Sequence, residues 1–225
     1  MKKILYLLFL ITSITTFAQE TKEQSIGEFS EIKVYDRIEV ELIKADENKV
    51  VITGKNTKDV VIVHKNDILK IRMTFKTAFK GDETTVQVYY TSLDVIDANE
   101  GTFIGSNDIM DQFDLKIKTQ EGGVVKLALK DVRFLDVKAV TGGSVSLSGN
   151  VVNQTIDITT GGAYNAKKLI AENSTVTIKA AGVAHVNTTK KAIAKVRAGG
   201  SIYIYGNPET LEQDTILGGK IIIEE

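Results

Sequence analysis

Residues 137–147 read VKAVTGGSVSL, and this stretch decides the fold because two short alternating runs flank the pair Gly142-Gly143. The same arrangement recurs along the second half of the chain, with Ala181 in place of the first glycine in one copy. Successive copies lie 18 to 20 residues apart, counted on the second residue of each pair: Gly123, Gly143, Gly162, Gly182, Gly200 and Gly219. A pattern that returns at so constant a period indicates a protein built from repeated structural units.

Each repeat is predicted to contain a strand, a glycine corner, a second strand and a turn. After the second glycine, apolar residues occupy positions two and four and more polar residues positions one and three, which is the period of a half-buried strand. Glycine suits the corner because it reaches positive φ without a Cβ clash. The sequence therefore predicts an all-β protein, a short, right-handed parallel β-helix (β-solenoid) with about 19–20 residues per coil. A sandwich of hairpins is the alternative.

The inward-facing positions of these predicted strands contain one aromatic residue, Tyr164. Its expected neighbours are small: Ala166 on the same coil and Ala184 on the next. Small residues beside a large one are what a constant core volume requires. A buried tyrosine hydroxyl usually finds a hydrogen-bond partner, so we expect one for Tyr164.

The chain divides into four predicted segments. Residues 1–18 have the pattern of a secretory signal peptide, with lysines at positions 2 and 3, an apolar run over 4–11 and a cut after Ala18. Residues 19–28 follow as a short N-terminal linker. Residues 29–100 are β-rich but lack the glycine period, and we interpret them as an irregular cap segment. Residues 101–225 are the glycine-cornered coils, which are expected to share one core with residues 29–100. No later segment is apolar and long enough to span a membrane.

The ends of a solenoid expose unpaired strand edges that can pair with another chain. The segment 29–100 is expected to cap the first end. At the other end the apolar run Ile221–Ile223 is followed by Glu224 and Glu225. These two glutamates are expected to discourage end-to-end pairing, and an oligomer formed through the solenoid ends is the competing prediction.

Composition excludes several classes of function. The 225 residues include 28 Lys and Arg, 29 Asp and Glu, and no Cys, with a net charge of −1. Near-neutral charge argues against a nucleic-acid partner, and the lack of cysteine excludes disulfides, thiolate zinc sites and cysteine nucleophiles. His64 and His185 fall in different halves, and the acidic residues between positions 94 and 114 match no calcium loop. We therefore predict no catalytic, cofactor-binding or metal-ligating residue and no cofactor.

The outward-facing positions of the coils provide one candidate binding surface. If the coils stack in register, one outward face carries a strip formed by Ser146, Asn165, His185, Tyr203 and Tyr205. Aromatic rings beside polar groups are typical of surfaces that bind a sugar or another protein. The strip therefore predicts a glycan or another envelope or surface protein as the partner, and an ordinary solvated β face is the alternative.

Several stretches resemble a bacterial family described as the putative auto-transporter adhesin, head GIN domain. They read FSEIKV over 29–34, IEVEL over 38–42, DILKI over 67–71 and YTSLDVI over 90–96, and the glycine-led coils follow them. The resemblance implies a β-helical, exported protein with a surface or adhesive role. It supplies no catalytic residues.

These observations predict an exported, non-enzymatic binding or scaffolding protein, a cell-surface adhesin. We expect it in the periplasm of a Gram-negative bacterium, or outside the cell, on its surface or released. Two alternatives remain open. One is a polysaccharide-active β-helix enzyme, which would need paired acids on one coil face. The other is a periplasmic module that pairs with a protein partner through a strand edge.

Overall fold

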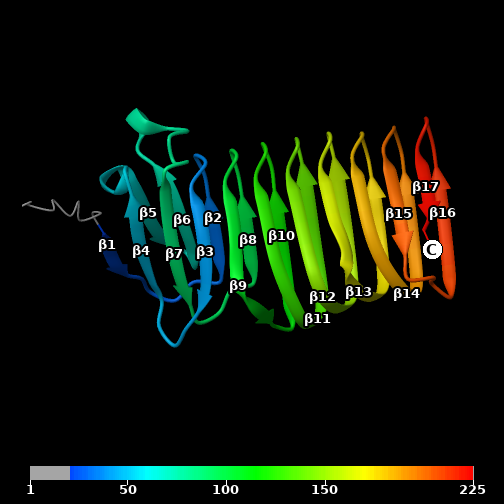
Figure 1. Ribbon diagram of the computed structural model, residues 1–225, viewed down its shortest axis with the longest axis horizontal. Helices are drawn as coiled ribbons and strands as arrows, with labels where there is room; N and C mark the ends of the chain where they lie inside the picture. Colours follow the sequence, from blue (N-terminus) through cyan, green and yellow to red (C-terminus); the bar gives the residue numbers. More distant parts are fainter. Residues whose placement is uncertain (1–20, 225) are drawn as a thin grey trace, which may run out of the picture.

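Strands joined by tight corners arrange the chain as a stack of coils (Figure 1). The computed structural model describes residues 21–224, so the predicted signal peptide lies outside the described residues. Two single-turn 3₁₀ helices, η1 (Thr57–Asp59) and η2 (Phe75–Thr77), interrupt the strands, and no helix in residues 21–224 is long and apolar enough to cross a membrane. The strands are β1 (Lys22–Ser25), β2 (Glu31–Val34), β3 (Glu39–Lys44), β4 (Lys49–Gly54), β5 (Val60–Lys65), β6 (Ile68–Met73), β7 (Thr84–Tyr90), β8 (Val95–Ala98), β9 (Phe103–Asp111), β10 (Asp114–Thr119), β11 (Val124–Val140), β12 (Ser144–Thr159), β13 (Ala163–Ile178), β14 (Val183–Val196), β15 (Ser201–Tyr205), β16 (Thr210–Thr215) and β17 (Lys220–Ile223).

The strands form two layers, which we call sheet 1 and sheet 2. Sheet 1 contains β3, β7, β9, β15, β17 and the first halves of β11–β14. Sheet 2 contains β2, β6, β8, β10, β16 and the second halves of β11–β14. Each long strand bends from sheet 1 into sheet 2, as β11 does at the register shift between Leu129 and Val132. Neighbouring coils pair in parallel, which confirms the predicted parallel β-solenoid.

The two glycines of each corner serve different purposes, as Gly142 and Gly143 show. Thr141 and Gly142 have positive φ angles of 49° and 74°, the combination that a type I′ turn requires. Gly143 is needed for a second reason. A Cβ at this position would lie 2.5 Å from the carbonyl oxygen of Thr119 on the preceding coil. The first glycine therefore forms the turn, and the second allows the coils to approach each other.

The N-terminal segment joins the same stack, but out of chain order. β2 lies between β6 and β8, and β3 lies between β7 and β9, all in parallel register. β4 and β5 then cover this end by antiparallel pairing with β7 and β6, and β1 pairs with β4. Residues 22–25, within the predicted linker, thus form the outermost strand of sheet 1.

One hydrophobic core lies between the two sheets. The inward-facing residues after the glycine corners are at most 1% exposed at Val145, Tyr164, Ala184 and Ile202, as the alternation predicts. The hydroxyl of Tyr164 donates a hydrogen bond to Gln154 Oε1 at 2.6 Å. The expected partner of this buried tyrosine is therefore present.

Candidate functional site

The structure places all five residues of the strip on the outer face of sheet 1. Ser146, Asn165, His185 and Tyr203 are direct register neighbours on β12, β13, β14 and β15. Tyr205 lies two residues beyond Tyr203 on the same strand. They face outward because the strand residues beside them face the core. The strip is therefore one continuous surface, and its role in binding stays a prediction.

An aromatic cluster forms the C-terminal half of the strip. The rings of His185 and Tyr203 are stacked, with centroids 4.5 Å apart and planes 7° from parallel. The Tyr205 ring lies 6.0 Å from that of His185, and its hydroxyl lies 3.1 Å from His185 Nδ1. Lys167 Nζ lies 4.4 Å from the Tyr205 ring centroid. Because His185 and Tyr203 stack on each other, each ring covers one face of the other.

The local environment shifts the pKa values of two members of the aromatic cluster, His185 and Tyr205. Desolvation lowers the pKa of His185, against the opposing effect of the Glu224 carboxylate, and Lys167 lowers it further. Desolvation also raises the pKa of Tyr205, and Glu224 and Tyr203 add to this increase. Both shifts favour the uncharged forms, the neutral imidazole of His185 and the neutral phenol of Tyr205.

A groove of about 1040 Å³ runs across the outer face of sheet 1, from β7 and β3 to β13. Ser146 and Asn165 line this groove. His185, Tyr203 and Tyr205 continue the same face over the next two strands, beyond the groove. The structure thus connects the predicted strip to a larger hollow that the residue pattern did not reveal.

Small outward-facing side chains account for the hollow. Gly105, Ala128, Ser146 and Ser148 lie along the groove on β9, β11 and β12. Gly105 instead makes room for the Phe103 ring, because a Cβ at this position would lie 2.9 Å from it. The ladders also shift register near Ala128 and Ser148, which bends the strands. The groove therefore depends on bulges as well as on side-chain size.

Charge is unevenly distributed along the groove. At the β3 end, the two oxygens of Glu41 accept hydrogen bonds from Gln87 Nε2 at 2.9 Å and Asn107 Nδ2 at 2.7 Å. Lys126 on β11 and Lys167 and Lys168 on β13 line the rest of the groove, and none of the three forms an ion pair with any residue from 21 to 224. Three cations without ion-pair partners, beside polar side chains, favour an anionic ligand in this part of the groove.

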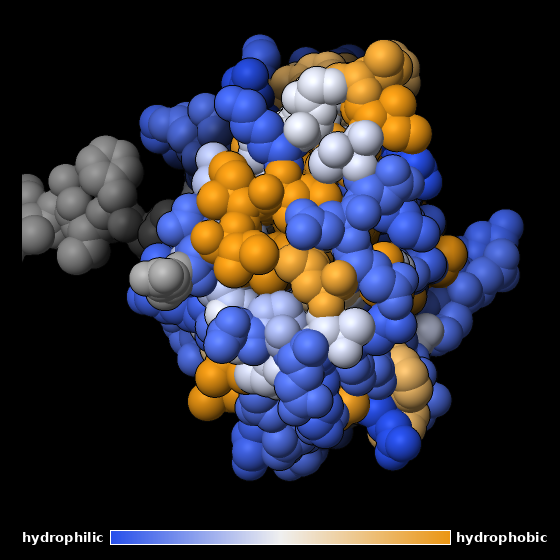
Figure 2. Space-filling model, turned by 90° about the vertical axis from the view of Figure 1, so that its right-hand side faces the viewer, coloured by the Kyte–Doolittle hydropathy of each residue, from blue (hydrophilic) through white to orange (hydrophobic). Residues whose placement is uncertain are grey.

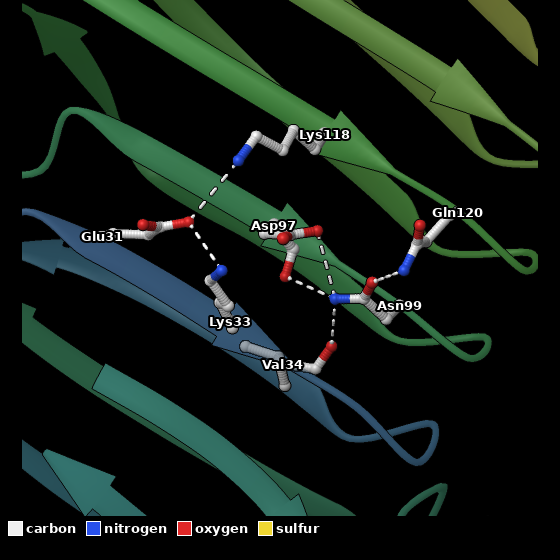
Figure 3. Close-up of polar contacts among 7 residues, drawn as sticks. All are labelled: Glu31, Lys33, Val34, Asp97, Asn99, Lys118 and Gln120. Carbon is white, nitrogen blue, oxygen red and sulfur yellow. Dashed lines mark hydrogen bonds and ion pairs between the residues drawn. The ribbon is translucent and has the colours of Figure 1, made fainter. Parts of the chain in front are cut away.

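A second polar cluster lies on the outer side of sheet 2, where the N-terminal coils meet the repeats (Figure 3). Glu31 on β2 forms ion pairs with Lys33 Nζ at 3.2 Å and with Lys118 Nζ at 3.6 Å. Because Lys118 belongs to β10, these contacts reach across β8. The ion pairs therefore connect the first coil of the chain to the start of the repeats.

Asn99 connects the same three strands by hydrogen bonds. Its Nδ2 donates to the Asp97 carboxylate and to the Val34 carbonyl, each at 3.2 Å. Its Oδ1 accepts from Gln120 Nε2 at 2.5 Å. The side chains in Figure 3 thus point toward one another and bind within the protein. This arrangement indicates a structural role at the junction of the coils.

The acidic residues between positions 94 and 114 do not form one site. Asp97 lies on β8 in sheet 2, whereas Asp108 and Asp111 lie on β9 in sheet 1. No group of three His, Asp or Glu side chains that could hold a metal ion occurs in the described part of the chain. The other histidine, His64, contacts the Glu28 carbonyl through Nε2 at 2.9 Å.

Sequence comparison assigns most of the chain to one family. Residues 28–208 match the family described as "Putative auto-transporter adhesin, head GIN domain". No curated protein matches the chain. The match begins just before β2 and extends past β15, so it includes the groove and the whole strip.

Three solved structures share the fold. A "putative adhesin" from Bacteroides fragilis has a TM-score of 0.81 and 18% identity, over 93% of this chain and 98% of that one. A "putative lipid binding protein" from Parabacteroides distasonis has a TM-score of 0.72 and 17% identity, over 92% and 97%. A "putative adhesin" from Parabacteroides merdae has a TM-score of 0.68 and 19% identity, over 92% and 96%. At these identities the likeness shows the shared fold alone.

Proposed function

Because this chain belongs to the family "Putative auto-transporter adhesin, head GIN domain", we propose that it is an exported, non-enzymatic adhesin that binds an acidic glycan on sheet 1. The observation that carries the proposal is the groove of about 1040 Å³ on that face. Ligand sites commonly have volumes of about 300–1,000 Å³, so this groove has room for several sugar units.

The chemistry of the groove supports an acidic glycan as the ligand. The side chains of Ser146, Ser148 and Asn165 can exchange hydrogen bonds with sugar hydroxyl groups. Lys126 and Lys168 supply unpaired positive charges for carboxylate or sulfate groups. Hydrogen bonds to ionised groups are about twice as strong as those between neutral groups. These lysines are therefore expected to dominate affinity, while the hydroxyl and amide groups orient the ligand.

Glu39 and Glu41 favour a carbohydrate-active enzyme as the second candidate, because both line the groove from β3. Glycoside hydrolysis requires one carboxylic acid that donates a proton and a second carboxylate that acts on the same sugar. Both oxygens of Glu41 already accept hydrogen bonds from amides, so Glu41 is held as an acceptor. Glu41 would then be the carboxylate of the pair, and hydrolysis would need Glu39 as the proton donor. Release of reducing sugar from a bound polysaccharide would favour the enzyme.

The direct test is a glycan array that carries neutral, carboxylated and sulfated oligosaccharides, probed with purified residues 19–225. The proposal predicts saturable binding to acidic glycans, which weakens as the salt concentration rises. A blank array, or binding restricted to neutral sugars, would contradict the proposed ligand. Calcium is added in one series, because binding that requires calcium would contradict a site that depends on the groove lysines.

A double substitution in the groove tests the location of the site. Lys126→Gln with Lys168→Gln should weaken binding of an acidic glycan by about tenfold or more, since each charged hydrogen bond contributes about 1.5–3 kcal/mol. Lys138→Gln is the matched control, because Lys138 is an exposed lysine on sheet 2 of the same repeats. Titration calorimetry measures the three affinities. If the double variant and the control lose the same amount of glycan affinity, the binding site lies outside the groove.

The proposed location is the periplasm or the cell surface. The signal-peptide pattern of residues 1–18 and the family support export. Mass spectrometry of the mature protein should find Gln19 at its N-terminus. An intact Met1 in the cytoplasmic fraction would argue against export.

A further inference from the structure

The C-terminal end of the stack exposes a strand edge and apolar side chains. β17 pairs with β15 on one side, and no register pairing in residues 21–224 involves its other side. Figure 2 looks onto this end and shows apolar surface gathered near its centre. Ile216, Leu217 and Ile223 are 47%, 78% and 56% exposed. The opposite end, by contrast, is covered by the antiparallel strands β1, β4 and β5.

The sequence of this edge is complementary to itself. Residues 220–224 read KIIIE. If the β17 strands of two copies run antiparallel with their Ile222 residues opposite each other, Lys220 of each copy faces Glu224 of the other. Ile221 of each copy then faces Ile223 of the other. Opposite charges and apolar side chains that face each other stabilise an antiparallel pair. A two-fold interface requires this reciprocity.

The free backbone groups fit the same register. The amide of Lys220 donates to the Gly200 carbonyl, just before β15, at 3.0 Å, and the amide of Glu224 donates to the Ile204 carbonyl of β15 at 2.9 Å. Successive residues of a strand direct their backbone groups to opposite edges, so those of Ile221 and Ile223 point to the free edge. The proposed register makes these residues the hydrogen-bonded pairs of the new ladder. It therefore satisfies the exposed N–H and C=O groups of β17.

The side chains also meet on the correct faces. Ile221 and Ile223 face inward, because their register partners on β15 are completely buried. Lys220, Ile222 and Glu224 alternate with them and face outward. Pairing would thus extend the hydrophobic core with isoleucine contacts and form the two ion pairs on the outer face of sheet 1.

The neighbouring edge strand, β16, does not oppose this contact. Its outward acidic residues are already neutralised within the protein. Glu212 pairs with Lys191 Nζ at 2.8 Å, and Asp214 pairs with an Arg197 guanidinium nitrogen at 2.7 Å. The two acidic groups are therefore not left as bare charges when a second copy approaches.

We propose that this surface joins two copies of the chain end to end, by antiparallel pairing of their β17 strands centred on Ile222. Sheet 1 then continues from one copy into the other, so its outer face has the same direction in both. If the proposed function holds, the dimer presents two glycan grooves on one face. Two linked sites bind a surface polysaccharide more tightly than either site alone.

A charge exchange tests this register, and it needs no glycan. Lys220→Glu and Glu224→Lys each place like charges opposite each other, so each should weaken dimerisation by about fivefold or more. The double variant Lys220→Glu/Glu224→Lys restores opposite charges and should restore the dimer. Sedimentation equilibrium of residues 19–225 across a concentration series measures the dimerisation constants of the wild type and the three variants. Lys138→Glu, a charge reversal on sheet 2 away from this edge, is the control.

A wild-type chain that stays monomeric across the concentration series would overturn the proposal. So would single variants that dimerise like the wild type, or a double variant as weak as the single ones. If Lys220→Glu weakens dimerisation and the double variant does not restore it, the result would indicate that β17 pairs with a different strand. Circular dichroism shows whether each variant is folded. Because dimerisation is measured without ligand, its failure leaves the groove proposal intact, and failure of the glycan array leaves the dimer intact.

Discussion

At the scale of single residues, Tyr164 shows how polar groups connect the coils inside an aliphatic core. Its hydroxyl donates to Gln154 Oε1, and Gln154 Nε2 donates to Ser174 Oγ at 2.8 Å. Ser174 Oγ in turn lies 2.5 Å from Thr188 Oγ1. These four buried side chains extend from β12 to β14. A complete buried network of this kind stabilises the fold, whereas an incomplete one costs free energy.

Removal of the Tyr164 hydroxyl should therefore destabilise the protein more than its size suggests. Tyr164→Phe leaves Gln154 Oε1 without its buried donor and should lower the free energy of unfolding by about 1–3 kcal/mol. Tyr203→Phe makes the same chemical change on the outer face of sheet 1 and should stay within about 0.5 kcal/mol. Urea denaturation followed by circular dichroism measures both. Similar effects of the two variants would show that the network contributes little.

Part of this arrangement around Tyr164 could be predicted from the sequence. The position of Tyr164 in an inward column, beside Ala166 and Ala184, follows from the period of two. That its hydroxyl needs a partner follows from burial. The partner itself could not be predicted, because Gln154 lies on the opposite sheet and its approach depends on the bend of β12. The mutual stacking of His185 and Tyr203 likewise depends on rotamers that no sequence pattern specifies.

At the scale of elements, the spatial order of the strands in the first coils could not be predicted from the sequence. Residues 29–100 have the alternation of strands, but they lack the glycine period that orders the repeats. Nothing local indicates that β2 inserts between β6 and β8. The contacts of Asp97, Asn99 and Gln120 form at this insertion, and they show how side chains hold β2, β8 and β10 in place (Figure 3).

The half-buried carboxylate of Asp97 gives this junction a pH dependence. Burial raises its pKa in the folded protein, although Lys118 and Lys33 oppose the change. The folded state then binds a proton more readily than the unfolded state, so the contribution of Asp97 to stability falls as pH rises through the raised pKa. Asp97→Asn removes this loss. The variant should be more stable than the wild type at pH 7, and the difference should vanish below about pH 4, the ordinary aspartate range.

Thermal unfolding across a pH series measures this difference. Asp157→Asn is the control, because Asp157 is a sheet 2 carboxylate that pairs with Lys179 Nζ at 3.1 Å. Such surface ion pairs contribute about 0–1 kcal/mol, so this control should be neutral or slightly destabilised at pH 7. Asp97→Asn that is less stable than the wild type at pH 7 would show that the lysines outweigh burial.

At the scale of the whole molecule, the glycine period predicts the stack, the shared core and the strip on one outer face. The groove could not be predicted. It forms where Glu39, Phe103 and Val124 come into register on β3, β9 and β11, and this links the N-terminal segment to the repeats. The bulges that bend the strands leave no mark in the hydrophobic pattern. The groove therefore forms only when the N-terminal segment and the repeats assemble into one stack. The strip, by contrast, can be predicted from the alternation within individual coils.

The most direct test of the central claim is lysine footprinting of the unaltered protein with and without the acidic glycan that binds best on the array. An acetylating reagent modifies exposed lysines, and mass spectrometry reports each position. A glycan in the groove of sheet 1 should protect Lys126 and Lys168, and leave Lys138 and Lys179 on sheet 2 as reactive as before. Unchanged reactivity of the groove lysines, or protection confined to sheet 2, would contradict the proposed site.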